Sequence, residues 1–113
     1  MDFNETKDFL EHLDDLAIDD EVFIHTKRGF LEAAVRYANI RAEWALQTLD
    51  ERRAINERRT AAHNAFIDRC NILGRYMYMK GKDASWREGL GHDRKDIGDF
   101  ACLIHAVLGI SAR

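Results

Sequence analysis

Residues 24–49 read Ile-His-Thr-Lys-Arg-Gly-Phe-Leu-Glu-Ala-Ala-Val-Arg-Tyr-Ala-Asn-Ile-Arg-Ala-Glu-Trp-Ala-Leu-Gln-Thr-Leu, and their apolar positions decide the fold class. One set recurs at steps of seven, four and three residues: Ile24, Leu31, Val35, Ala38, Ala42, Ala45 and Leu49. This spacing is the heptad-like seam of helices that pack at a shallow angle. Further apolar residues widen the seam on one side: Phe23, Phe30, Ala34, Tyr37 and Trp44. The stretch therefore predicts a long amphipathic helix packed along other helices.

This helix needs an end, because an unbroken helix over 20–80 would be about 90 Å long. A compact chain of 113 residues has a radius of gyration of only about 13 Å. Thr48 and Glu51 have the spacing of a capping box, which satisfies the free amides at the start of a helix. We therefore expect the break at 47–52. The alternative is a bundle of unbroken long helices that a second chain completes.

Cap residues also delimit a first helix and a second one. Asp2 and Glu5 repeat the capping-box spacing, and the apolar periodicity that follows predicts a first helix over about 4–17. Asp19 or Asp20 is expected to cap the second helix, because a short acidic side chain accepts hydrogen bonds from the first turn.

The third helix is expected over about 51–80. Its first ten residues, 51–60, are almost entirely polar and predict a solvated end or a polar partner surface. A core face then returns at Ala62, Phe66, Cys70, Leu73 and Met77. Lys80-Gly81 is a typical helix end. A loop follows over 81–92, with room for one helical turn from Ser85 to Glu88.

Asp93 is expected to cap the last helix, which is apolar nearly all round over 100–110 and should be the buried central helix. His105 is the one polar side chain in that run, so we expect it to be buried and hydrogen-bonded. The chain as a whole predicts an all-α, up-and-down bundle of about four helices in a single domain, 1–113. The seam and the polar start of the third helix exceed the needs of one small globule, so we expect a homodimer to complete or extend the bundle.

The charges are divided unevenly along the chain. The sequence carries 20 acidic and 17 basic side chains, a net charge of −3, which excludes a generally basic nucleic-acid coat. Residues 1–21 hold a net charge of −8, so the remaining residues carry +5. We interpret the first segment as an acidic helix beside a mildly basic body. The alternative is an acidic segment that docks a partner or mimics nucleic acid.

The sequence favours a cytoplasmic protein. Its N-terminus, Met-Asp-Phe-Asn-Glu, is acidic where a signal peptide would be basic and then apolar. The apolar run 100–110 spans about 16 Å as a helix, well short of a hydrocarbon core of roughly 30 Å. Cys70 and Cys102 each lie in an apolar helical pattern and are expected to be free thiols.

No motif in the sequence predicts a metal, a cofactor or a nucleophile. Five histidines are present, but Glu-x-x-His does not occur as a pair, and His63 and Cys70 are about 10 Å apart along a helix. Zinc ligands lie about 2.0–2.3 Å from the ion, so one ion cannot reach both. A serine elbow, a phosphate-binding loop and a dinucleotide fingerprint are likewise missing from the sequence. We expect no metal and no cofactor.

Arg58 and His63 are separated by four residues. This spacing resembles the Arg-x4-His motif of HEPN ribonucleases, small all-helical proteins that cut RNA without a metal at a dimer cleft. The resemblance implies that His63 is an acid–base catalyst and that Arg58 holds the phosphate. On a continuous helix, however, Arg58 and His63 point about 140° apart, whereas Arg59 shares the face of His63. The alternative is that His63 is a core or interface histidine.

Two sets of cations are candidate nucleic-acid patches. The first is Arg52, Arg53, Arg58 and Arg59, diluted by neighbouring acids. The second interleaves cations with aromatic residues: Arg75, Tyr76, Tyr78, Lys80, Lys82, Trp86 and Arg87. Aromatic side chains beside cations bind single strands by base stacking. The alternative is that these aromatic residues close the end of the bundle while the cations reach into water.

These observations favour a non-enzymatic interaction or regulatory protein that works through helix–helix contacts with an unidentified protein partner. A metal-independent ribonuclease of HEPN type is the second hypothesis, and a weak single-stranded nucleic-acid binder is the third. We expect no membrane association.

Overall fold

The computed structural model describes residues 1–111, and all of their regular structure is helical. Five helices follow one another along the chain: α1 (Phe3–Leu16), α2 (Glu21–Ala45), α3 (Leu49–Met79), α4 (Ser85–Leu90) and α5 (Arg94–Ser111). The all-α prediction is confirmed, with four helices of seven or more residues. Within the described residues, none of these helices combines the length and the apolarity that crossing a membrane requires.

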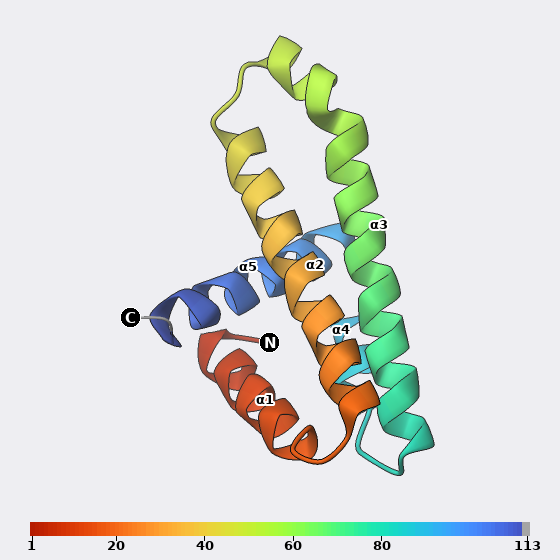
Figure 1. Ribbon diagram of the computed structural model, residues 1–113. Coiled ribbons are helices and arrows are strands. Elements are labelled where there is room, and N and C mark those ends of the chain that lie inside the picture. Colours follow the sequence, from red (N-terminus) through yellow and green to blue (C-terminus); the bar gives the residue numbers. More distant parts are fainter. Residues whose placement is uncertain (112–113) are drawn as a thin grey trace.

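The two longest helices form an antiparallel hairpin, which Figure 1 shows as two rods joined at the top. The break lies where the capping box predicts it. The Thr48 hydroxyl accepts a hydrogen bond from the Glu51 amide at 3.3 Å and donates one to the Glu51 carboxylate at 2.9 Å. The alternative of an unbroken helix over 20–80 is therefore wrong.

The other predicted caps are also confirmed. The carboxylates of Asp2, Asp20 and Asp93 each accept a hydrogen bond from the backbone amide three residues further on. The end of α3 uses Gly81, whose φ of +73° is a left-handed conformation that suits glycine. Local sequence chemistry therefore fixes the helix ends.

The arrangement of the helices is less regular than the expected up-and-down bundle. Figure 1 shows α5 running across the α2–α3 hairpin instead of alongside it, with the short α4 next to α3. α1 packs mainly against α5. The hairpin extends beyond the crossing point of α5, which makes the molecule elongated, with extents of 47 × 30 × 24 Å.

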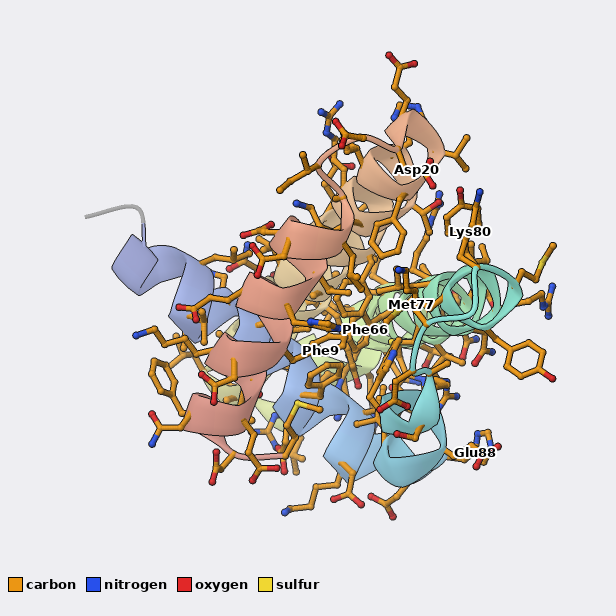
Figure 2. The ribbon with its side chains drawn as sticks, turned by 90° about the horizontal axis from the view of Figure 1, so that it is seen from below. Phe9, Asp20, Phe66, Met77, Lys80 and Glu88 are labelled. Atoms are coloured by element: carbon orange, nitrogen blue, oxygen red, sulfur yellow. The ribbon has the colours of Figure 1, made fainter. Side chains whose placement is uncertain are left out.

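Aromatic side chains fill the core at this crossing. Phe30 stacks on Phe66 with ring centres 5.7 Å apart, and Phe100 of α5 lies 6.0 Å from Phe66. Phe9 of α1 joins them, and Figure 2 shows Phe9, Phe66 and Met77 gathered in the middle of the molecule, with Glu88 at the outside. Burying large rings removes more apolar area per residue than burying alanines does.

The core face of α2 is not the expected one, because the aromatic residues of this helix are buried in preference to the alanines of the seam. The side that was expected only to widen the seam provides most of the core: Phe23, Phe30, Ala34 and Tyr37 are buried. Of the seam itself, Ala38 is buried, whereas Ala42, Ala45 and Leu49 are exposed. The seam therefore is not the main packing surface within this chain.

The last helix is also less buried than expected. Ile97, Phe100 and Ile104 lie in the core, but His105 is exposed on the opposite side of α5. The prediction of a buried His105 is wrong, because α5 covers one side of the hairpin and leaves its own outer side in water. The side chain of Ile110, which ends the predicted apolar run, lies outside the described residues.

Candidate functional site

The candidate site lies where α5 begins to cross the hairpin. Tyr37 and Arg41 are four residues apart on α2 and share one face, and Arg59 and His63 do the same on α3. Arg94, the first residue of α5, completes the set. We refer to these residues, Tyr37, Arg41, Arg59, His63 and Arg94, as the arginine cluster.

Three polar atoms of the arginine cluster are buried without a hydrogen-bond partner in the described part of the chain. They are the Tyr37 hydroxyl, Nε2 of His63 and Nε of Arg59. Tyr37 is fully buried and His63 is 8% exposed, and their rings meet edge to face at 5.3 Å. An unpaired buried polar group costs roughly 1–3 kcal/mol, and native proteins hold few of them. These three atoms have hydrogen-bonding capacity that a polar ligand or a buried water could use.

The arginines around these atoms are only partly neutralised. Arg41 donates to the Asp99 carboxylate at 3.3 Å and to the Cys102 sulfur at 3.4 Å. Arg94 donates to the Thr60 hydroxyl at 3.3 Å, which leaves its charge uncompensated. Within residues 1–111, neither Arg59 nor Arg94 forms an ion pair. The site therefore has an excess of positive charge.

Burial and the positive charges of the arginines both affect the pKa values of His63 and Arg59. Burial lowers the pKa of His63 below its ordinary value, and the positive charges of Arg94, Arg59 and Arg41 lower it further, while a contact with Asn64 opposes them. Burial, followed by the charge of Arg94, also lowers the pKa of Arg59. His63 is thus neutral at pH 7. An anion at this place would relieve the repulsion among the arginines.

The contact of His63 with Asn64 suits one tautomer of the ring. Nδ1 lies 3.3 Å from Oδ1 of Asn64, so the tautomer that carries its proton on Nδ1 can donate to this oxygen. Nε2 then carries a lone pair and can take up a proton. The arginine cluster can therefore hold an oxyanion through arginine and the Tyr37 hydroxyl, with a proton acceptor beside it.

Trp44 lies next to the arginine cluster on the projecting part of the hairpin. The guanidinium of Arg59 is 4.4 Å from the centre of its ring system, and that of Arg52 is 5.7 Å away. Arg52 is held there because its Nε donates to the Trp44 carbonyl oxygen at 2.9 Å. Trp44 is half-buried, and its ring and the two guanidinium groups near it are planar groups of the kind on which nucleobases stack.

The structure separates the two arginines of the HEPN-like motif. Arg58 lies on the outer face of the hairpin, where its guanidinium is 3.9 Å from the Glu43 carboxylate. Arg59 is the one directed toward His63, in agreement with the helical spacing. Arg53 is almost fully exposed at the end of the hairpin and lies 3.9 Å from Asp50.

The second candidate nucleic-acid patch does not form one surface. Trp86 is half-buried, and its ring lies 4.9 Å from Phe9 and its Nε1 donates to the Met77 sulfur. Arg87 donates to Asn71 at 2.6 Å and to the Gly91 carbonyl at 2.8 Å. These side chains hold α4 against α3.

The remaining residues of this patch are at the end of α3. Tyr76 donates to the Asp20 carboxylate at 2.7 Å, and Lys80 lies 3.8 Å from the same carboxylate. Figure 2 shows Asp20 and Lys80 next to each other at one margin of the molecule. Tyr78 is 78% exposed, and Arg75 and Lys82 are also in water.

The possible metal ligands of the described chain are dispersed, and one of its two cysteines is deeply buried. In the range 1–111, no three His, Cys, Asp or Glu side chains converge on a point that could hold an ion. Cys70 is a free, fully buried thiol, and burial raises its pKa to about 12. It is therefore protonated and unreactive at neutral pH.

Sequence reasoning found Arg59 and His63 but missed Tyr37, Arg41 and Arg94 as members of a site. The available signal was the repeated spacing of a ring and an arginine four residues apart on two adjacent helices. The contact between these helices and the start of α5 is a tertiary feature, which spacing along one helix does not show.

Comparison of the chain with protein-family models, with curated proteins and with solved structures finds no match to any of them.

Proposed function

We propose that the protein is a non-enzymatic binding protein whose arginine cluster holds a phosphate group of a single-stranded nucleic acid. The observation that carries this proposal is the set of three unpartnered buried polar atoms surrounded by three arginines. A phosphate offers oxygens to the Tyr37 hydroxyl and to the arginine N–H groups at once, and arginine matches its geometry in a bidentate way.

Trp44 supports a nucleic acid over a free phosphate. A base next to the bound phosphate can stack on the surface that Trp44 forms with Arg52 and Arg59, which requires the base to be unpaired. In Figure 1 the acidic helix α1 lies away from the end of the hairpin at which α2 and α3 are joined. It therefore does not oppose the approach of a nucleic-acid strand to this end.

The test is fluorescence anisotropy of a labelled single-stranded RNA of mixed sequence, titrated with the whole protein at two salt concentrations. Each phosphate contact contributes about one unit to the slope of log affinity against log salt, so Arg94→Gln should lower that slope and reduce affinity about tenfold. Arg53→Gln removes the same charge from an exposed place outside the cluster and should have little effect. Absence of binding, or equal losses in both variants, contradicts the proposal.

A second candidate function is metal-independent RNA cleavage of HEPN type. The specific observation is that the free Nε2 of neutral His63 lies in the same cluster as Arg59, as a proton acceptor beside a phosphate site requires. In this version Arg59 has the role that the motif spacing gave to Arg58.

Cleavage of the same RNA in the presence of a chelator separates the two candidates. An enzyme should lose cleavage in His63→Gln and Arg59→Gln and keep it in Arg58→Gln, while His63→Gln still binds RNA. A protein that binds RNA in every condition and never cuts it is the non-enzymatic binder.

A further inference from the structure

The outer face of the hairpin is a surface that no other part of the described chain covers. α4 and α5 pack behind α2 and α3 in Figure 1, so the opposite face of the hairpin meets solvent. Three hollows with volumes of about 410, 380 and 570 Å³ follow one another along it. The first two share Arg69 and the last two share Arg36, so they lie in a row along the hairpin, and we call this row the outer groove.

Small residues line the middle and one end of the outer groove, beside larger residues such as Ile40 and Arg69. Gly29 and Ala33 line it from α2, and Ala61, Ala62 and Ala65 line it from α3. Small residues let another helix approach closely, because side chains do not hold the backbones apart. Ala61 is exposed, and Ala33 and Ala65 are partly exposed, although alanine gains little from contact with water.

The charges along the outer groove alternate in sign. The shared lining residues place Glu21, Arg69, Glu32 and Arg36 in this order from one end, and the paired Glu43 and Arg58 lie at the other end. Reversal of the groove exchanges the positions of Glu32 and Arg36, and it brings the pair Glu43 and Arg58 to the end that holds Glu21 and Arg69. The groove is therefore complementary to its own copy when that copy lies antiparallel, whereas a parallel copy would place like charges together.

We infer that the outer groove is a twofold homodimer interface, in which α2 and α3 of two chains form an antiparallel four-helix bundle. An isologous contact of this kind places Glu32 of one chain opposite Arg36 of its copy, and the reverse, on the two sides of the axis. Arg69 then faces Glu43 of the copy, and Arg58 faces Glu21.

The size of the face agrees with a stable dimer. The lining residues of α2 extend over 21–43, roughly 34 Å of helix. Two helices about 9 Å apart form a face about 18–20 Å wide. The buried area is then roughly 650 Å² for each chain, close to the roughly 800 Å² of a standard interface. This contact would also occupy Arg58, and it leaves the arginine cluster on the other side of the hairpin open.

The experiment is sedimentation equilibrium of the whole chain over a concentration series, with charge reversals at the two positions beside the axis. The wild-type chain, of 13.1 kDa, should be dimeric. Arg36→Glu and Glu32→Arg should each weaken the dimer at least tenfold, because each creates two like-charge pairs. The double variant, which exchanges the two charges, should restore it. Lys7→Glu, on the exposed face of α1, is the matched control and should remain dimeric.

A wild-type chain that stays monomeric at 100 µM overturns the inference. So does a dimer that Arg36→Glu leaves unchanged, or a double variant that is helical by circular dichroism but not restored. A cross-link gives a second measurement that does not depend on charge. Ala33→Cys, beside the axis, should form a disulfide-linked dimer on oxidation, and Ala106→Cys on the exposed side of α5 should not; equal cross-linking in the two also overturns the inference.

Discussion

Arg41 lies against the backbone of Gly98, in the space that the side chain of any other residue at position 98 would occupy. A β-carbon added to Gly98 would lie 2.6 Å from Cζ of Arg41, well inside contact distance. The glycine thus lets the guanidinium reach Asp99 and Cys102 across the crossing of α2 and α5.

Gly98→Ala should therefore displace Arg41 and weaken RNA binding several-fold. Its effect on stability should be small, within about 1 kcal/mol, because alanine gains about that much in a helix while a partly exposed ion pair is lost. Anisotropy and urea denaturation measure the two effects. The matched variant is Gly109→Ala on the same helix, where an added β-carbon meets nothing within 4 Å. It should raise stability slightly and leave binding unchanged, and equal binding by the two variants would show that Arg41 does not contact the strand.

His63 should make the protein less stable in mild acid. Its pKa in the folded protein is lowered, chiefly by burial, whereas the unfolded chain has the ordinary value of about 6.5. As the pH falls, the unfolded chain binds this proton first. The contribution of neutral His63 to the free energy of unfolding is therefore fully present above about pH 6.5. It is lost as the pH falls from there toward the pKa of His63 in the folded protein.

Urea denaturation between pH 5 and 8 measures this loss. His63→Gln should remove its part of the pH dependence. Asn64→Ala should steepen it, because the contact with Asn64 favours the charged ring. If wild type and His63→Gln show the same slope over this range, His63 is not buried in its neutral form.

Helix ends were predictable from the sequence because they depend on neighbouring residues. Thr48 and Asp93 each accept a hydrogen bond from an amide three residues away, and nothing distant is needed. The direction of α5 was not predictable in this way. It depends on how Phe100 fits against Phe30 and Phe66, at ring distances of about 6 Å, and an apolar periodicity does not encode such a crossing.

The candidate site was predictable only in part for the same reason. The shared face of Arg59 and His63 follows from helix geometry. That Tyr37 is opposite His63 depends on the register of the hairpin, and the place of Arg94 depends on the end of a loop. His105 shows the opposite kind of error, because it was expected in the core and is exposed. An apolar helix can lie on the surface of a protein with only one side buried.

Substitutions in α2 and α3 can test the corrected core. Phe66 is fully buried among aromatic rings, so Phe66→Ala should cost about 3–5 kcal/mol of stability. Leu49, which the seam placed in the packing surface, is 72% exposed. Leu49→Ala should change stability by less than about 0.5 kcal/mol. Denaturation of the two variants at equal protein concentration decides between the aromatic face and the seam, and a large cost at Leu49 would favour the seam.

The same substitution should have opposite effects on two tyrosines. The Tyr37 hydroxyl is buried without a partner in the described chain, so Tyr37→Phe should stabilise the protein by about 1 kcal/mol while it weakens RNA binding. Tyr76 donates to Asp20, so Tyr76→Phe should destabilise the protein and leave RNA binding unchanged. That hydrogen bond lowers the pKa of Asp20 in the folded protein, so the destabilisation should begin to fade as the pH falls below about 4 and should disappear only below that lowered pKa. Thermal denaturation at pH 7 and pH 3 with anisotropy at pH 7 tests both tyrosines. A Tyr37→Phe protein that is less stable than wild type would mean that its hydroxyl already has a partner, and the main argument for a ligand at the arginine cluster would be lost.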